Sequence, residues 1–255
     1  MIDTHCHMDD PVYQEDFDRF VRTQREAGVE AVLVPGVNAA SVPSVREVCA
    51  RCPDFLYPAV GLHPEEVKDD WEEQLRTIGA ALDDASVQYV AVGEIGLDYH
   101  FDVTWKQQQL QAFRCQLQWA MNRDLPVMIH SRDATEDCLS VLHDFPGLRG
   151  VMHCFSGSHE TALEITRLGL YLGIGGVITF RNCRLAENLQ GIGLQWLVLE
   201  TDAPYMAPVP YRGKPNESRW MSFVAERLAA VYGTSVDEID RVTTANARRL
   251  FRLNE

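Results

Sequence analysis

Eight short runs rich in Val, Ile and Leu recur along the chain, and segments with helical periodicity separate them. The runs lie at residues 2–6, 31–37, 55–62, 89–95, 127–130, 150–154, 171–174 and 196–199. Strands that are apolar along nearly their whole length are typical of a parallel sheet buried on both faces. Eight such strands alternating with helices predict an α/β fold with a closed (β/α)8 TIM barrel. A doubly wound open sheet is the alternative.

The length of 255 residues fits one barrel, which needs about 250 residues, although two small domains would also fit. We expect one domain over residues 1–255. The clearest helical pattern carries four apolar residues on one face: Leu110, Phe113, Leu117 and Met121. Two more helices are predicted at 219–232 and 236–251, and Ser235 and Glu238 have capping-box spacing at the start of the second.

The formal charge of -14 opposes broad electrostatic binding to nucleic acid or to an anionic membrane, so a polyanionic substrate would need local cations. The seven cysteines are scattered, and no basic segment followed by an apolar run opens the chain. We therefore expect a cytoplasmic protein with reduced thiols. Cys49 and Cys52 share a helical face with Val45 and Val48, which favours core packing over metal or redox chemistry.

Histidines and carboxylates gather at the carboxyl ends of the predicted strands, where barrel enzymes build their sites. From the first strand to the eighth, these residues are His5, His7, His63, Glu94, His130, His153 and Asp202. The three remaining histidines, His100, His143 and His159, lie elsewhere.

His5 and His7 have the i, i+2 spacing that places two imidazoles on one face of a strand. Glu94 is a carboxylate inside an apolar strand, where it needs a cation or a proton. A hydrogen-bonded histidine pair and a salt bridge from Glu94 to an arginine are the alternatives. Nitrogen and oxygen donors without a convincing thiolate favour Zn, Mn, Mg or Ni over a structural zinc.

Two carboxylates, Glu200 and Asp202, are two positions apart, so we expect them to point the same way from the last strand. We assign Asp202 to the metal and Glu200 to a ligand histidine, whose other N–H it would accept. His130 and His153 each follow apolar residues, and either alone is more often a satisfied core histidine. Together with the residues above, they predict a metal site.

Six motifs carry these residues. They read Ile-Asp-Thr-His-Cys-His (2–7), Gly-Leu-His-Pro (61–64), Val-Gly-Glu-Ile-Gly-Leu-Asp-Tyr (92–99), Pro-Val-Met-Ile-His-Ser-Arg-Asp-Ala (126–134), His-Cys-Phe-Ser-Gly (153–157) and Leu-Glu-Thr-Asp-Ala-Pro-Tyr (199–205). As a set they resemble the TatD family of metal-dependent hydrolases, in the amidohydrolase superfamily, and the likeness spans the whole chain. The resemblance implies a barrel of the metal-dependent hydrolase type and 3'–5' exonuclease activity on single-stranded DNA or RNA.

The resemblance also implies two divalent ions, carried over by position. One would be held by His5, His7, Glu94 and Asp202, and the other by Glu94, His130 and His153. Two such ions can activate a water for attack on phosphorus. We expect Asp202 to accept a proton in that step, and His63, near the site, is the candidate proton donor to the leaving group.

Loop residues would then hold the end of an unpaired strand. The candidates for phosphate contacts are Arg132, Ser156, Arg181, Arg212 and Lys214, and those for base stacking are Tyr99, Phe155, Tyr205 and Tyr211. Solvated surface charge and a lining role are the alternatives. We expect a monomer that binds single-stranded ends and no membrane.

Two other functions stay open at this point. One is a metal-dependent ester or amide hydrolase, such as a D-aminoacyl-tRNA deacylase, and the other is an inactive scaffold or binding module. The fold does not distinguish them. Activity on aminoacyl esters alone would favour the first, and absence of bound metal would favour the second.

Overall fold

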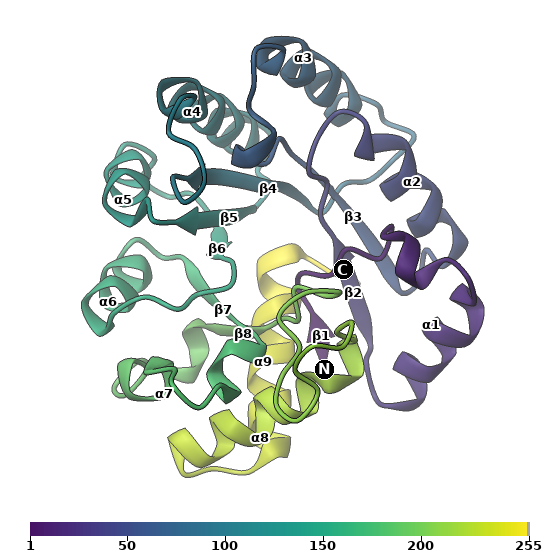
Figure 1. Ribbon diagram of the computed structural model, residues 1–255, viewed down its shortest axis with the longest axis vertical. Coiled ribbons are helices and arrows are strands. Elements are labelled where there is room, and N and C mark those ends of the chain that lie inside the picture. The colour runs from purple at the N-terminus through teal and green to yellow at the C-terminus, as the bar shows by residue number, and fades with distance from the viewer. Residues whose placement is uncertain (254–255) are drawn as a thin grey trace.

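The computed structural model describes residues 1–253, in which eight parallel strands pair in chain order. The strands are β1 (Ile2–Asp3), β2 (Ala31–Val34), β3 (Leu56–Val60), β4 (Ala91–Asp98), β5 (Val127–Arg132), β6 (Gly150–Met152), β7 (Tyr171–Ile174) and β8 (Leu197–Leu199). Helices follow the strands and surround them (Figure 1). The prediction of a (β/α)8 barrel is confirmed, and the alternative prediction of a doubly wound open sheet is wrong.

The α-helices are α1 (Phe17–Glu26), α2 (Ser41–Arg51), α3 (Trp71–Leu82), α4 (Lys106–Arg123), α5 (Thr135–His143), α6 (His159–Arg167), α7 (Leu185–Asn188), α8 (Met221–Tyr232) and α9 (Val236–Phe251). Short 3-10 turns are η1 (Pro11–Tyr13), η2 (Pro64–Glu66), η3 (Gly176–Thr179), η4 (Leu194–Trp196) and η5 (Ser218–Trp220). Among residues 1–253, no helix has the length and apolar character needed to cross a membrane.

The ring closes where the chain after β1 meets the chain after β8. The amide of Thr4 donates to the carbonyl of Leu199 at 3.0 Å, and the amide of Asp202 donates to the carbonyl of His5 at 2.9 Å. Cys6 and Ala203 form a parallel bridge just beyond. These bonds fix the first histidines of the chain directly beside its last carboxylate.

Helix α9 covers the opposite, amino-terminal end of the barrel. Its Leu250 and Phe251 share a buried cluster with Leu33 and Met128 from the strands, and the side chain of Asn246 donates to the carbonyl of Leu197 at 2.8 Å. The predicted bounds of this helix are correct, and Ser235 caps it by accepting the amide of Glu238 at 3.1 Å. In Figure 1 this helix, in yellow, crosses the ring between β1 and β8.

Most strand bounds differ from the prediction by one to three residues at an end, and two strands differ in ways that change the site. β4 extends to Asp98, so Glu94 lies inside the strand and not at its end. β8 stops at Leu199, and Asp202 has a left-handed backbone with φ of 57°. Because the strand ends before both carboxylates, the prediction that Glu200 and Asp202 share one strand face is wrong.

Helix α4 buries most of its predicted apolar face. Phe113 and Leu117 are fully buried, but Met121 is 39% exposed because it lies in the last turn of the helix. Cys49 is buried in the core, and Cys52, which follows the last residue of α2, packs against the same core; both thiols are free, as the prediction of core packing requires.

Leu117→Ala should therefore lower the free energy of unfolding by about 2–5 kcal/mol, because it leaves a cavity in a closely packed core. Met121→Ala, one turn further on, is the matched control and should change it by no more than about 0.5 kcal/mol. Urea unfolding midpoints measure both. Equal effects would contradict the packing described for α4.

Candidate metal centre

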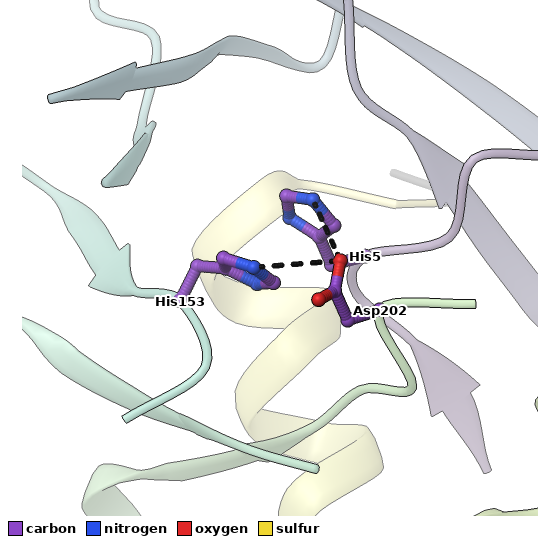
Figure 2. Close-up of side chains that lie close together, drawn as sticks. All are labelled: His5, His153 and Asp202. Atoms are coloured by element: carbon purple, nitrogen blue, oxygen red, sulfur yellow. Dashed lines mark ion pairs between the residues drawn. The ribbon is translucent and has the colours of Figure 1, made fainter. Parts of the chain in front are cut away.

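The predicted histidines and carboxylates converge at the open, carboxyl-terminal end of the barrel. Figure 2 shows His5, His153 and Asp202 pointing toward one another from the ends of β1, β6 and β8. The rings of His5 and His153 stack at 3.5 Å between centroids. Residues about 150 and 200 positions apart in the chain thus meet at one point.

Glu94 lies at the centre of the cluster and is only 3% exposed. Its carboxylate is 3.2 Å from Nε2 of His5 and 3.0 Å from Nδ1 of His130. Nε2 of His63 lies at 3.5 Å and Nε2 of His153 at 3.7 Å. One carboxylate from β4 therefore meets imidazoles that lie in or just after four other strands.

Asp202 forms the second negative centre, nearer to the solvent. One oxygen lies 3.6 Å from Nε2 of His7, 3.7 Å from Nε2 of His153 and 3.9 Å from Nε2 of His5. Its side chain is 18% exposed, against 4% for that of Glu94. Asp202 is thus the carboxylate of the cluster that faces the open end of the barrel.

The outward nitrogens of two histidines face further carboxylates. Nε2 of His130 lies 2.9 Å from Asp98, and Nδ1 of His153 lies 3.1 Å from Glu200. A carboxylate that takes one ring N–H fixes the tautomer and directs the other nitrogen inward. Nδ1 of His130 and Nε2 of His153 are therefore the atoms available to a metal.

Asp98 is the site residue that the sequence analysis missed. It lies four positions after Glu94 in β4, so both side chains are on the same face of the strand. That alternation was the available signal, and it was hidden because the strand was predicted to end at residue 95.

Glu200 occupies the place that the sequence analysis gave it, through contacts that depend on a glycine. It accepts the backbone amide of Cys154 as well as facing His153. A Cβ at Gly173, in the neighbouring β7, would lie 2.1 Å from the carboxylate. The glycine therefore provides the space for the carboxylate that supports His153.

The electrostatics of the cluster favour charged carboxylates. Burial opposes ionisation of Glu94, but the surrounding histidines more than offset it and hold its pKa well below the usual range. Burial likewise opposes charge on His130 and His153, yet facing carboxylates raise their pKa to about 9 and about 10. Without a metal, protons on these two rings compensate the buried negative charge.

Three observations show that the cluster also fits a metal ion. Among the described residues, both ring nitrogens of His5 are buried without a hydrogen bond, and so is one oxygen of Glu200. Burial and the neighbouring His153 lower the pKa of His5, which favours the neutral ring that binds metals. Donor atoms also lie within 4.8 Å of one another in four sets: His5, His7 and Glu94; His5, His153 and Asp202; His63, Glu94 and His130; and His153, Cys154 and Glu200.

These sets compare directly with the predicted ligands. All six lie in the cluster, and three of the four residues predicted for one ion, His5, His7 and Glu94, form one set, whereas Asp202 groups with His5 and His153. His153, assigned with Glu94 to a second ion, is equally distant from Glu94 and Asp202. His153 therefore lies at the border between the two predicted ion positions.

His63 lies within reach of Glu94 but is arranged differently from the other histidines. Its Nδ1 accepts the backbone amide of Glu65 at 3.2 Å, so the neutral ring carries its proton on Nε2, which faces Glu94. A protonated nitrogen cannot bind a metal. His63 therefore presents an N–H to the site and does not present a lone pair.

The predicted substrate residues lie in the loops of the open end, with different degrees of exposure. Tyr205 is 57% exposed and its ring lies 6.0 Å from that of His7. Arg132, Ser156, Arg212 and Lys214 are exposed, and Arg132 is the last residue of β5. Phe155 is buried in the core, which favours a lining role over base stacking. The ring of Tyr211 stacks on that of Trp220, with 4.1 Å between centroids.

Comparison with known proteins gives matches along nearly the whole chain. The family model described as TatD related DNase matches residues 2–252. A Bacillus subtilis protein described as the uncharacterized metal-dependent hydrolase YabD is 38% identical over 257 residues, which cover 100% of both chains. The 3'-5' ssDNA/RNA exonuclease TatD of Erwinia billingiae is 32% identical over 261 residues, covering 99% of each.

A solved structure agrees with these matches. The crystal structure of YjjV, a TatD homolog from Escherichia coli K12, superposes with a TM-score of 0.91 at 34% identity and covers 99% of this chain and 98% of that one. The barrel, the cluster at its open end and matches of this length lead to one conclusion: the chain belongs to the TatD family and is a metal-dependent hydrolase.

Proposed function

We propose that this protein is a 3'–5' exonuclease that hydrolyses phosphodiester bonds of single-stranded DNA or RNA. The observation that carries the proposal is the central position of Glu94, with imidazole nitrogens on both sides of its carboxylate. A carboxylate with a separate nitrogen donor at each oxygen suits a bridge between two divalent ions. The names of exonuclease relatives support the substrate and the polarity.

In the proposed site, His5, His7, Glu94 and Asp202 would hold one ion, and Glu94, His130 and His153 would hold the other. Zn, Mn, Mg and Ni all suit these donors. Such ions, when bound, lower the pKa of a coordinated water toward about 7 and polarise the phosphate. The protein's own groups must then move the protons.

Asp202 is the proposed proton acceptor. Burial opposes its charge, but His153, His7 and His5 together lower its pKa, so it is ionised at neutral pH and able to accept a hydrogen bond from water. Its side chain is also more exposed than that of Glu94, which places it on the side from which a substrate arrives. Glu94, deeper in the barrel, only holds the ions.

His63 is the proposed proton donor to the leaving sugar oxygen. Its Nδ1 is occupied by the amide of Glu65, so Nε2 carries the proton and lies at the edge of the cluster. The ring of His63 also contacts that of His130 edge to face at 4.5 Å. These contacts hold the N–H in one direction, as proton transfer in a transition state requires.

Divalent metal should raise the melting temperature of the protein. At a concentration of about one hundred times Kd, binding adds about 2.7 kcal/mol, which corresponds to roughly 5–10 °C for a chain of this size. Glu94→Gln should largely abolish the shift, whereas His143→Asn, a change at a surface histidine paired with Glu164, should keep it. If metal raised the melting temperature of Glu94→Gln as much as that of the wild type, the proposed role of Glu94 as a shared metal ligand would be contradicted.

Hydrolysis of end-labelled single-stranded DNA and RNA tests the activity itself. The metal-loaded protein should produce a ladder that starts at the 3' end, and Asp202→Asn should lower kcat by about 10²- to 10⁴-fold. Asp144→Asn, at an exposed residue paired with Arg114, is the matched control. Cleavage of aminoacyl esters, with none of phosphodiesters by metal-loaded protein, would refute the proposal and favour a deacylase.

The leaving group distinguishes proton donation by His63 from metal binding. His63→Gln should lower kcat by about 10²-fold or more for an oligonucleotide, whose sugar alkoxide needs a proton. A p-nitrophenyl phosphodiester should be much less affected, because p-nitrophenolate leaves without one. Equal losses on both substrates, or a lost metal-induced melting shift, would show that His63 acts through the metal.

A further inference from the structure

One aromatic side chain beside the site is almost entirely in solvent. Phe101, in the loop between β4 and α4, is 73% exposed, more than Tyr205 at 57%. β4 carries Glu94 and Asp98, so this loop leaves the barrel directly from the metal cluster. A large apolar ring in this position offers a free surface to a ligand.

The ring of Phe101 is held by two polar neighbours. The guanidinium carbon of Arg132 lies 4.7 Å from the ring centroid, and the ring of His100 meets it edge to face at 4.6 Å. His100 is fixed in turn by Asp133, at 2.7 Å from Nδ1. The loop therefore presents Phe101 in a defined orientation although it lies in solvent.

Arg132 connects this ring to the site. It ends β5, two residues after His130, and pairs in register with Asp98 of β4. The carboxylates around it have other partners: Asp98 contacts His130, Asp133 contacts His100, and Asp137 contacts Lys106. Within residues 1–253, no carboxylate lies at ion-pair distance from Arg132. Its charge is available to an incoming phosphate.

A second pair of a cation and an aromatic ring lies across the opening. Arg212, in the loop after β8, covers the ring of Phe180 at 3.7 Å from the centroid, and Phe180 follows η3 after β7. Figure 1 shows β4 and β5 on the opposite side of the ring from β8 and β1. The Phe101 pair thus lies on one side of the metal cluster and the Phe180 pair near the other.

We propose that Phe101 and Arg132 form a stacking platform for an unpaired base of the substrate, with the guanidinium directed to the adjoining phosphate. This inference rests on the proposed nuclease function and assigns the origin of its strand preference. Every base has a flat face that can stack on an aromatic ring, so binding tolerates any sequence. In a duplex those faces are covered by neighbouring base pairs, so the platform selects single strands.

The test compares an intact oligonucleotide with an abasic strand of the same length, which keeps the phosphates and lacks the bases. Phe101→Ala should raise KM for the intact strand by about 5- to 100-fold with little change in kcat, because only uniform binding is lost. KM for the abasic strand should not change. Phe101→Trp should restore the affinity, and Val103→Ala, 60% exposed in the same loop, is the matched control.

A binding measurement that needs no turnover separates this inference from the proposed function. The Glu94→Gln protein, alone and combined with Phe101→Ala, is titrated into a fluorescently labelled strand and followed by anisotropy. Weaker binding of the intact strand in the double variant supports the platform, even if the wild-type protein cleaves no phosphodiester. Equal binding of intact and abasic strands, or an unchanged KM in Phe101→Ala, would overturn the stacking platform. The nuclease proposal would still stand if the wild-type protein cleaved phosphodiesters.

Discussion

The negative charge of Glu94, buried inside a strand of the barrel, is the constraint on which the rest of the site depends. A carboxylate removed from water is costly unless cations or hydrogen-bond donors surround it. Here His5, His63, His130 and His153 provide them, from positions in or just after four different strands. Each of these imidazoles must then be oriented, and Asp98, Glu200 and the amide of Glu65 do this for three of them. The groups that orient the histidines are therefore needed because of the charge at the centre of the cluster.

The barrel separates this chemistry from the residues that stabilise the fold. Helix α9 packs its apolar face against the amino-terminal end, so the polar groups at the other end need not contribute to the core. The seam between β1 and β8 contributes both to the stability of the barrel and to the geometry of the site. Asp3, completely buried, accepts the hydroxyl of Thr201 at 2.6 Å, and burial raises its pKa to about 7. This contact joins the strand ends that carry His5 and Asp202, so closure of the ring also sets the distance between them.

Charge alone does not explain how an acidic protein would hold a polyanion. With a net charge of -14, long-range attraction to nucleic acid is unfavourable. Local cations at the open end must therefore supply the attraction. Two of them, Arg132 and Arg212, lie over aromatic rings in loops on different sides of the cluster. Stacking is short-ranged and little affected by net charge, so such pairs suit recognition of a strand end better than recognition of a long duplex.

The apolar pattern and the residues at strand ends determined the order of strands, the barrel and the set of histidines and carboxylates, because periodicity and strand position are local properties. The sequence did not reveal Asp98, whose role depended on β4 extending four residues past Glu94, or the exposure of Phe101. It also suggested a shared strand face for Glu200 and Asp202, whereas β8 ends before either residue. Only the tertiary structure decided which nitrogen of each histidine faces inward, that His63 presents an N–H, and that His153 lies between Glu94 and Asp202. These properties depend on contacts between residues distant in the chain, which are set when the ring closes.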